Sequence, residues 1–509
     1  TRAEGEAAAI PNRLRTRFTY DRLDRPQETL FADGNVRKTW RFISTFADLN
    51  GMRARRPEAR SYNEDHFDGD GRDGSLATST VYDAFGNVIR SGSWEYADGV
   101  GYEGGYGPFW ATHYLYDDLD RLNTVTDPVG ARWAYRYDVR GNRTRATDPA
   151  LGIWTMAYDA NGNLTRQTDA KGQDIAFDYD ALDRAVRKHA GTGGARVTTH
   201  YRYDEPRDGY HNTGHLTRQE VRYPAGDGQP ARSHVHELNY GTEGLLRWEN
   251  HRIDDGVHPV RTLDVSRWYK RTGDMAGWCL PETPGSTSRI CRGGFHYDAA
   301  RRLVAMDGLI DRVEYDATGY RTGTDYSNGA RVTWQHDRRR GWLTQVDGFA
   351  AGSATPSNGV YYSRSASGRV MRQYAFHDAS DYDFTYDHAG RLLRADNRHA
   401  HMGGFAGRAF RYDPAGNMTF HSRIGDYRYD TGRQRLTRAG DWAFQYDANG
   451  NTTRGLYGKA MTYDGENRPL SVTLNGVTTR YVYAADGSRL LRIDRAGTAQ
   501  QTTTAYFGP

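Results

Sequence analysis

Two pairs of histidines have the spacing at which side chains could bind a metal ion. His234 and His236 stand two residues apart, as do His399 and His401, so the imidazoles of each pair would face the same side of a strand. Imidazole is a common zinc ligand, but a zinc site needs at least three protein ligands, and the sequence identifies no third one. A structural or exposed role is the favoured interpretation, and no metal site is predicted.

Two glycine-rich stretches match binding loops only in form. Residues 68–73 offer three carboxylates, as a calcium loop would, but Arg72 occupies a ligand-type position and Ser79 stands where an EF-hand loop has its acidic ligand. Residues 99–104 match the dinucleotide fingerprint, yet Pro108 follows and no helical period appears, whereas that phosphate site needs a helix terminus. A solvated surface loop and a flexible insertion loop are favoured, and no cofactor is predicted.

The chain has two cysteines, Cys279 and Cys291, which are too few for a disulfide framework. They flank a turn-like stretch at residues 284–288 and could face each other across a hairpin. Two buried thiols are the favoured interpretation, with a disulfide as the alternative. Neither a nucleophile elbow nor a convincing Ser-His-Asp set is visible, so the sequence nominates no catalytic residue.

The composition indicates a thin, polar sheet rather than a thick apolar core. Of 509 residues, 37% are hydrophobic, yet aromatic residues reach 13%, whereas disordered chains are poor in them. The net charge is +4 and no block of like charge stands out, which favours arginines paired with carboxylates and aromatic rings over a nucleic-acid surface. No apolar run approaches the roughly 20 residues that span a bilayer, so no membrane span is predicted.

A repeated unit dominates the chain. The dipeptide Tyr-Asp occurs fifteen times, and fourteen copies belong to recurring units. From Tyr116 to Tyr179 the spacing is 21 residues three times in succession, and from Tyr412 to Tyr463 it is 17 residues three times in succession. The fourteen tyrosines are Tyr20, Tyr82, Tyr116, Tyr137, Tyr158, Tyr179, Tyr203, Tyr297, Tyr315, Tyr386, Tyr412, Tyr429, Tyr446 and Tyr463.

Each unit predicts a strand, a tight turn and a second strand. In one copy Trp133, Tyr135 and Tyr137 alternate with other residues, which is the period-two pattern of a strand with an aromatic face. Asp138 and Gly141 then take the first and fourth positions of a type I turn, where Asp accepts hydrogen bonds through its side chain and Gly tolerates the exit geometry. A second strand and a second turn close the unit.

Two strands of six or seven residues cannot bury a face alone, so successive hairpins must pair side by side in one antiparallel sheet. Aromatic residues at equivalent positions would become cross-strand neighbours, each pair contributing about 0.2–1 kcal/mol. Because a sheet of this many strands accumulates twist, it must curl, and winding on itself is one way to protect its edges. We therefore predict an all-β chain with little helix.

The motif Tyr-Asp-x-x-Gly-Asn/Arg, which recurs from about residue 18 to the C-terminus, resembles the YD repeats of the Rhs family. The resemblance implies a YD-repeat antiparallel sheet that spirals into a hollow shell, or cocoon, over residues 18–509, after a lead-in at residues 1–17. Regular repeats are expected at 112–204 and 405–490, and irregular insertions at about 205–295 and 320–380. The residues taken to define the repeat are Tyr116, Asp117, Tyr137, Asp138, Gly141, Tyr158, Asp159, Gly162, Tyr179, Asp180, Tyr412, Asp413, Gly416, Tyr429, Asp430, Tyr446, Asp447, Gly450, Tyr463 and Asp464.

In Rhs polymorphic toxins and in toxin complexes such a shell encloses a toxic C-terminal polypeptide until delivery. The resemblance therefore implies a structural shell without enzyme activity, secreted or delivered from a bacterial cell. Its partners would be the enclosed toxin and an N-terminal plug or delivery module, such as a type VI secretion module. The alternatives are an extracellular adhesion or carbohydrate-binding shell, as in teneurins, and a toxin-complex BC-type shell with a self-cleaving C-terminal segment.

The chain departs from the family pattern at its ends. Family members usually carry a C-terminal aspartyl autoprotease with an Asp-Pro-Gly type motif, and no segment before Pro509 matches it. Asp127, Asp148 and Asp413 each precede a proline, but all three sit in ordinary repeat turns, and no catalytic role is expected for them. No signal peptide is visible after Thr1. We expect a repeat shell without plug, protease or toxin domain.

Overall fold

The regular structure of the protein is almost entirely strand. The computed structural model describes residues 16–31, 36–47, 53–62, 77–94, 109–193, 196–226, 229–282, 289–376, 380–387, 389–399, 407–430 and 432–506. Within these ranges there is no α-helix, and the strands are accompanied by the short 3-10 helix η4 (Leu456–Gly458). The predicted all-β class is confirmed.

Contacts divide the chain into two units. The first consists of Thr1–Asp120, Val125–Val129 and Leu309–Arg423, and the second of Arg121–Thr124, Gly130–Gly308 and Ile424–Pro509. Strand β8 (Leu122–Thr126) has residues in both. Each unit therefore combines an early and a late part of the sequence.

In the first unit the strands form two antiparallel ladders, in which each strand pairs with the next along the chain. The first ladder is β1 (Arg17–Tyr20), β2 (Pro26–Leu30), β3 (Val36–Ala47), β4 (Arg53–Tyr62), β5 (Ala77–Tyr82), β6 (Val88–Trp94) and β7 (Phe109–Tyr116). The second ladder is β24 (Ile310–Tyr315), β25 (Arg321–Tyr326), β26 (Arg331–His336), β27 (Leu343–Phe349), β28 (Asn358–Arg364), β29 (Val370–Ala375), β30 (Ser380–Tyr386), β31 (Leu392–Asn397), β32 (Arg408–Tyr412) and β33 (Met418–His421).

The second unit follows the same rule of pairing with the next strand, with breaks between Gly293 and Phe295 and between Ala443 and Gln445, where one sheet ends and another begins. Its early strands are β9 (Arg132–Tyr137), β10 (Arg143–Asp148), β11 (Gly152–Tyr158), β12 (Leu164–Thr168), β13 (Asp174–Tyr179), β14 (Ala185–Ala190), β15 (Val197–Tyr203), β16 (Leu216–Tyr223), β17 (Arg232–Tyr240), β18 (Leu246–Asp254), β19 (Arg261–Tyr269), β20 (Met275–Cys279), β21 (Cys291–Gly293), β22 (Phe295–Tyr297) and β23 (Leu303–Met306). Its late strands are β34 (Gly425–Asp430), β35 (Arg435–Ala439), β36 (Trp442–Ala443), β37 (Gln445–Tyr446), β38 (Thr452–Arg454), β39 (Ala460–Tyr463), β40 (Pro469–Leu474), β41 (Val477–Tyr483), β42 (Arg489–Asp494) and β43 (Thr502–Ala505).

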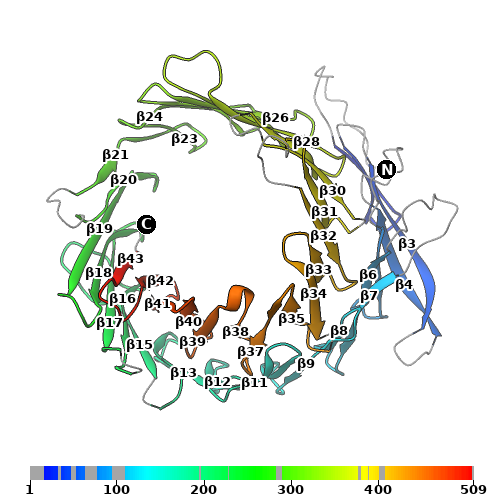
Figure 1. Cartoon of the computed structure of the whole chain (residues 1–509), viewed down its shortest axis with the longest axis horizontal. Helices are drawn as coiled ribbons and strands as arrows, with labels where there is room; N and C mark the ends of the chain where they lie inside the picture. Colours follow the sequence, from blue (N-terminus) through cyan, green and yellow to red (C-terminus); the bar gives the residue numbers. More distant parts are fainter. Residues whose placement is uncertain are drawn as a thin grey trace. The chain divides into compact units, whose positions relative to one another are not determined.

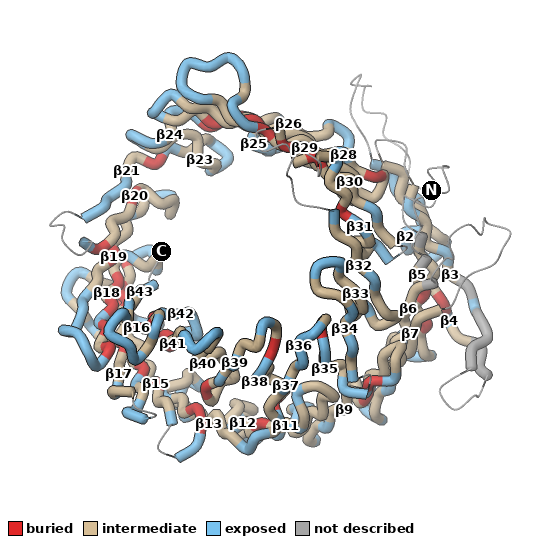
Figure 2. The backbone as a smooth tube through the Cα atoms, in the orientation of Figure 1, coloured by how far each residue is buried: buried red, intermediate tan, exposed pale blue. Residues whose placement is uncertain are grey.

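The strands of the regular repeats have one more protected face and one open face. In β11, Trp154, Met156 and Tyr158 are half-buried, whereas the residues between them are exposed. This alternation follows from the period-two aromatic pattern in the sequence. Fully buried residues are sparse along these strands (Figure 2), as the low hydrophobic content indicates.

A second layer covers part of the second unit. Ile253 of β18 packs in one apolar cluster with Val482, Leu490, Leu491 and Ile493 of β41 and β42, and all five are buried. Figure 1 shows β41, β42 and β43 beside β16, β17 and β18. The longer strands β16–β19 therefore bury one face under the C-terminal strands, a second layer that no pattern in the sequence predicts.

Turns that lie far apart in the sequence meet in the second unit, along what we call the seam. Lys188 Nζ pairs with Glu466 Oε1 at 2.6 Å, and Arg435 Nε donates to the Ala150 carbonyl at 2.8 Å. Gly465 lies so close to Gly191 that a Cβ at position 465 would stand 2.5 Å from the Gly191 nitrogen. The other seam residues are Asp169, Lys171, Asp447 and Asn449. These contacts join the turns of early repeats to the turns of late repeats.

Candidate functional site

In most of the described repeats the turn is held by its aspartate. Asp138 Oδ1 accepts the backbone N–H groups of Arg140 and Asn142, both at 2.9 Å, and Oδ2 accepts the Asn142 side-chain amide at 3.0 Å. The Gly141 N–H donates to the Asp138 carbonyl at 3.2 Å, and Gly141 has a φ of +91°. The register shifts between Arg143 and Arg145, so the type I turn is followed by a bulge at Thr144.

The same turn tolerates two substitutions within the chain. Arg184 replaces the asparagine after Asp180, and its Nε donates to Asp180 Oδ2 at 2.8 Å. Asp183 and Asn467 replace the glycine and adopt the same left-handed conformation, with φ of +60° and +62°. Asp and Asn enter this region more readily than other non-glycine residues, which explains why the motif varies at this position.

These hydrogen bonds stabilise the charged form of the turn carboxylates. The side-chain amide of Asn142, followed by backbone N–H donors, lowers the pKa of Asp138 below its ordinary value of 3.8. The side-chain amide of Asn163 lowers the pKa of Asp159 in the same way. The turn aspartates therefore act as anionic caps, and none of these contacts prepares a carboxyl group for proton transfer.

In most of the repeats that the structure describes, the tyrosine ties its own hairpin to the preceding one. The Tyr179 hydroxyl donates to the Leu164 carbonyl at 2.9 Å, and Leu164 begins the second strand of the previous unit. The same bond, at 2.7–3.0 Å, is made by Tyr116, Tyr137, Tyr158, Tyr203, Tyr269, Tyr297, Tyr386, Tyr412, Tyr446, Tyr463 and Tyr483. We call this bond the tyrosine tie; a phenylalanine could fill the space but could not make it.

Arginines add a second link between neighbouring units. The Arg184 guanidinium lies over the Tyr203 ring, 4.4 Å from its centroid, and also pairs with Asp204 at 2.7 Å. Arg468 stacks on Tyr483 in the same way, at 4.6 Å. An arginine in the turn of one unit thus stacks on the tyrosine of the next, in the geometry of a cation–π contact.

Comparison with known families agrees with this geometry. The family described as RHS Repeat matches residues 111–151 and 158–196, and the family described as Teneurin YD-shell matches residues 361–503. The chain therefore contains Rhs repeats and a segment similar to the YD-shell. Among curated proteins, no match to its sequence was found.

Solved structures share the fold of this Rhs/YD-repeat chain at low sequence identity. The TcdB2-TccC3 crystal structure matches with a TM-score of 0.79 and 16% identity, covering 96% of this chain and 27% of that one. A Photorhabdus luminescens Tc holotoxin pore matches with a TM-score of 0.78 and 15% identity, covering 96% of this chain and 26% of that one. The Rhs/YD-repeat chain thus spans about a quarter of the length of these chains and has the YD-shell fold.

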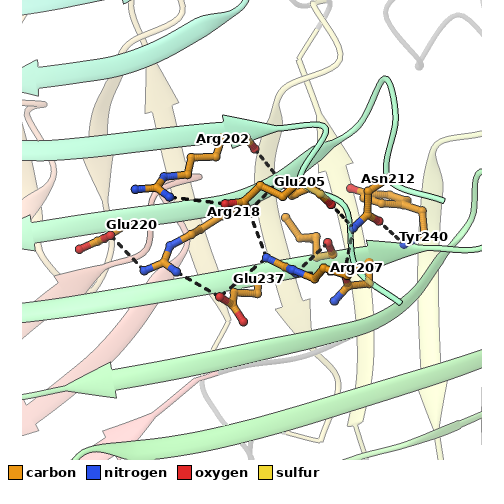
Figure 3. A network of polar contacts seen from close by, with 11 residues as sticks. Arg202, Glu205, Arg207, Asn212, Arg218, Glu220, Glu237 and Tyr240 are labelled. Atoms are coloured by element: carbon orange, nitrogen blue, oxygen red, sulfur yellow. Dashed lines mark hydrogen bonds and ion pairs between the residues drawn. The ribbon is translucent and has the colours of Figure 1, made fainter. Parts of the chain in front are cut away.

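The longer strands of the Rhs/YD-repeat chain carry a charge-balanced network. Arg218 pairs with Glu237 at 3.1 Å and with Glu220 at 3.3 Å, while Arg207 pairs with Glu205 at 3.1 Å and with Glu237 at 3.7 Å (Figure 3). These contacts join the segment between β15 and β16 to the strands β16 and β17. Each carboxylate has an arginine partner, so the network is suited to holding strands rather than to catalysis.

The histidines at 234 and 236 gain partners that the sequence could not identify. His236 Nε2 lies 2.8 Å from Glu249 Oε2, and His251 Nδ1 lies 3.0 Å from His234 Nε2. Burial, together with the neighbouring imidazoles of His251 and His236, lowers the pKa of His234 to about 3, so this ring is neutral near pH 7. Glu249 also pairs with Arg267 at 2.6 Å. One acidic and three imidazole side chains thus converge on one face.

Other residues singled out from the sequence have simpler surroundings. Cys279 and Cys291 are directly paired across β20 and β21 and form a disulfide, so the favoured interpretation of two thiols was wrong. His399 lies 3.7 Å from Asp381, while His401 falls outside the described residues, as do both glycine-rich loops at 68–73 and 99–104. The antiparallel register, which the sequence left open, decides the cysteine pairing.

The aspartates that precede prolines are structural in the turns. Asp148 Oδ1 accepts the N–H groups of Ala150 and Leu151, and its Oδ2 accepts the Trp133 indole N–H at 2.8 Å. Asp127 accepts the Val129 N–H, and Asp413 accepts the Asn417 N–H. Each of the three carboxylates therefore caps its own turn.

The repeat-defining residues are found at two kinds of position. Asp117, Asp159, Asp180, Asp413, Asp447 and Asp464 accept backbone N–H groups in their turns, and Gly162, Gly416 and Gly450 have φ of +91°, +90° and +78°. Tyr429 pairs opposite Leu436, and Asp430 ends β34 with its carboxylate 3.8 Å from Arg433.

Among the described residues, no helix is long and apolar enough to cross a membrane.

Proposed function

We propose that this chain forms part of the wall of a shell that encloses a polypeptide. The observation that carries the proposal is the fold shared with Tc toxin chains over nearly the whole of this chain. The tyrosine tie and the seam support it, because they join hairpins laterally and turn to turn without a thick core. A wall of this kind would surround a cargo without a thick apolar core of its own.

The finer proposal concerns the cargo and its delivery. We infer that the enclosed polypeptide is a toxic C-terminal segment of an Rhs-type polymorphic toxin, sequestered until a bacterial cell secretes or delivers it. An N-terminal plug or delivery module would be the second partner, and no cofactor would take part. The wall itself would perform no reaction, because the charged groups described above are paired in turns and networks. The repeat-defining residues would serve the wall alone.

A protease-protection experiment tests enclosure. A short reporter polypeptide with a protease site is fused to the C-terminus of the full chain, and its cleavage by added protease is followed in time. Enclosure predicts that the native fusion is cleaved much more slowly than the same fusion in denaturant. Cleavage at the same rate in both conditions would contradict it.

Opening the seam sharpens this test. Gly465→Leu should separate the two turns, because the new Cβ would stand 2.5 Å from the Gly191 nitrogen. Protease should then cleave the reporter faster. Gly226→Leu is the matched control: a Cβ there meets nothing within 4 Å, and neither glycine has a left-handed φ. Equal cleavage in the two variants would mean that the seam does not limit access.

Extracellular adhesion is the second candidate function. The match of residues 361–503 to the family described as Teneurin YD-shell favours it. An adhesion protein should show saturable binding to cell surfaces or immobilised glycans, and its reporter fusion should be cleaved freely. Binding to cell surfaces or glycans and cleavage of the reporter, both measured on the same fusion, therefore distinguish adhesion from enclosure.

A further inference from the structure

Three potential metal ligands converge on neighbouring strands of the second unit. His236 of β17 stands directly opposite His251 of β18, and Glu249 precedes His251 by two residues, so all three side chains share one face of the sheet. One ligand atom from each residue lies within 4.8 Å of the other two. The stacked rings of His236 and His251 have centroids 4.1 Å apart. The register of β17 and β18 thus builds a cluster that no local sequence motif contains.

The atoms at the centre of this cluster are buried and incompletely paired. His251 is 8% exposed, and its Nε2 has no hydrogen-bond partner among the residues that the structure describes. That nitrogen lies 3.7 Å from Glu249 Oε2, the same oxygen that His236 Nε2 approaches at 2.8 Å. Leaving a buried imidazole nitrogen unpaired costs stability. Two imidazole nitrogens and one carboxylate oxygen therefore face a common point. A cation there would give the His251 nitrogen a partner and would replace the hydrogen bond between His236 and Glu249.

The neighbouring residues orient the cluster as the outer shell of a metal site does. His234 Nε2 contacts His251 Nδ1 at 3.0 Å, which directs the other nitrogen of His251 toward Glu249. Arg267 pairs with Glu249 Oε1 at 2.6 Å and leaves Oε2 for the cluster. The positive charge of Arg267 opposes a cation, but its pairing with Glu249 offsets part of that charge. The Asp486 carboxylate also interacts electrostatically with His234 and His236.

We propose that His236, Glu249 and His251 bind one divalent transition-metal ion, with zinc as the best fit. Two imidazoles and one carboxylate form a known zinc donor set, in which water completes the tetrahedron. Metal–ligand bonds of about 2.0–2.2 Å require the three atoms to move closer together. The His236 side chain is still 16% exposed and can make this adjustment. The ion would fasten β17 to β18 beside the β41–β42 hairpin, independently of any role in enclosing a cargo.

Zinc titration of the full chain tests the site. The protein is stripped with a chelator, dialysed, and titrated with Zn²⁺ against a competing chromophore. We expect one ion per chain and at least about tenfold weaker binding in His236→Ala, since even outer-shell substitutions weaken metal sites by that factor. Ca²⁺ and Mg²⁺ should not compete, because they prefer oxygen ligands. With Co²⁺ in place of zinc, the visible spectrum should show tetrahedral bands that His236→Ala lacks.

His296→Ala is the matched control, because His296 pairs with Asp307 at 2.9 Å and, among the described residues, no third metal ligand lies close to this pair. It should bind zinc like the unaltered chain. Circular dichroism checks the fold of each variant, and His236→Asn replaces His236→Ala if the latter does not fold. Absence of binding to the unaltered chain at micromolar concentration would overturn the proposal. Equal affinity in the His236 variant and the unaltered chain would also overturn it.

Discussion

The second unit contains two ways of stabilising the same kind of ladder. Strands β9–β15 have five to seven residues and are joined to their neighbours by tyrosine ties and aspartate-capped turns. Strands β16–β19 have eight or nine residues and bury a face against β41 and β42. The first region distributes its stability over small, repeated bonds, whereas the second concentrates it in a few buried side chains.

This difference affects what each region can do. Repeated ties allow a wall to be lengthened one hairpin at a time without a new core, as in other repeat architectures. A covered region instead provides a dry environment, and it is there that the unpaired nitrogen of His251 is found. The regular region is therefore suited to forming surface, and the covered region to holding a site.

The largest predicted effect is in the covered region. Leu491→Ala should lower the free energy of unfolding by about 2–5 kcal/mol, because Leu491 is 2% exposed and its removal leaves a cavity. Val139→Ala in a repeat turn, at a side chain that is 95% exposed, should change it by less than about 0.5 kcal/mol. Urea unfolding at equal protein concentration measures both. Similar losses in the two variants would mean that burial under β41 and β42 is not what stabilises the region.

The next effect tests the turn backbone of the regular region. Gly162→Ala should cost about 1–2 kcal/mol, because Gly162 has a φ of +91° and a Cβ is disfavoured in that conformation. A Cβ at Gly162 would meet only Asn142 Oδ1, at an ordinary contact distance of 3.8 Å, so steric overlap adds nothing. Gly226→Ala, also at an open position but without a positive φ, should show no such loss in the same unfolding measurement.

The tyrosine tie should be worth less than the turn glycine at any one position. Tyr179→Phe removes the hydrogen bond to the Leu164 carbonyl and keeps the ring, so a loss of about 0.5–1.5 kcal/mol is expected. Tyr457→Phe is the control, because Tyr457 is 51% exposed and the described residues show no hydrogen bond from its hydroxyl. If both variants unfold at the same denaturant concentration, the tie contributes no stability.

The two regions also differ in how much the sequence could predict. Turn and strand were readable in the regular region, because Asp138, Gly141 and the alternating aromatic residues act within a few positions of one another. The tie was missed, although a signal existed: the residue two before the tyrosine varies among Tyr135, Met156 and Phe177, while the tyrosine itself recurs. A phenol that recurs where neighbouring rings vary indicates a role for the hydroxyl.

The contacts of the covered region could not be predicted from the sequence in this way. His236 meets Glu249 and His251 only through the register of β17 and β18. That hairpin has the bulge of the other repeats, but its turn begins with Gly241 and therefore lacks the Tyr-Asp motif. The packing of Leu491 against Ile253 joins residues more than 200 positions apart. Residue spacing does not encode contacts that are set by strand register and by long-range packing. The sequence therefore did not predict that His236, Glu249 and His251 lie together.

The smallest predicted effect separates the regions by their response to acid. The pKa of Asp138 is lowered in the folded chain, chiefly by the Asn142 side-chain amide, so this carboxylate contributes stability above its ordinary pKa of 3.8 and loses it as the pH falls through the folded value. Asn142→Ala should therefore destabilise the chain at pH 7 and do so less at pH 3, where the unaltered turn has begun to lose the same interaction. Leu491→Ala, which removes no charge interaction, should cost a similar amount at both pH values. Unfolding curves at the two pH values measure this contrast. If the loss of unfolding free energy in Asn142→Ala does not change with pH, the charged form of Asp138 is not what stabilises the turn.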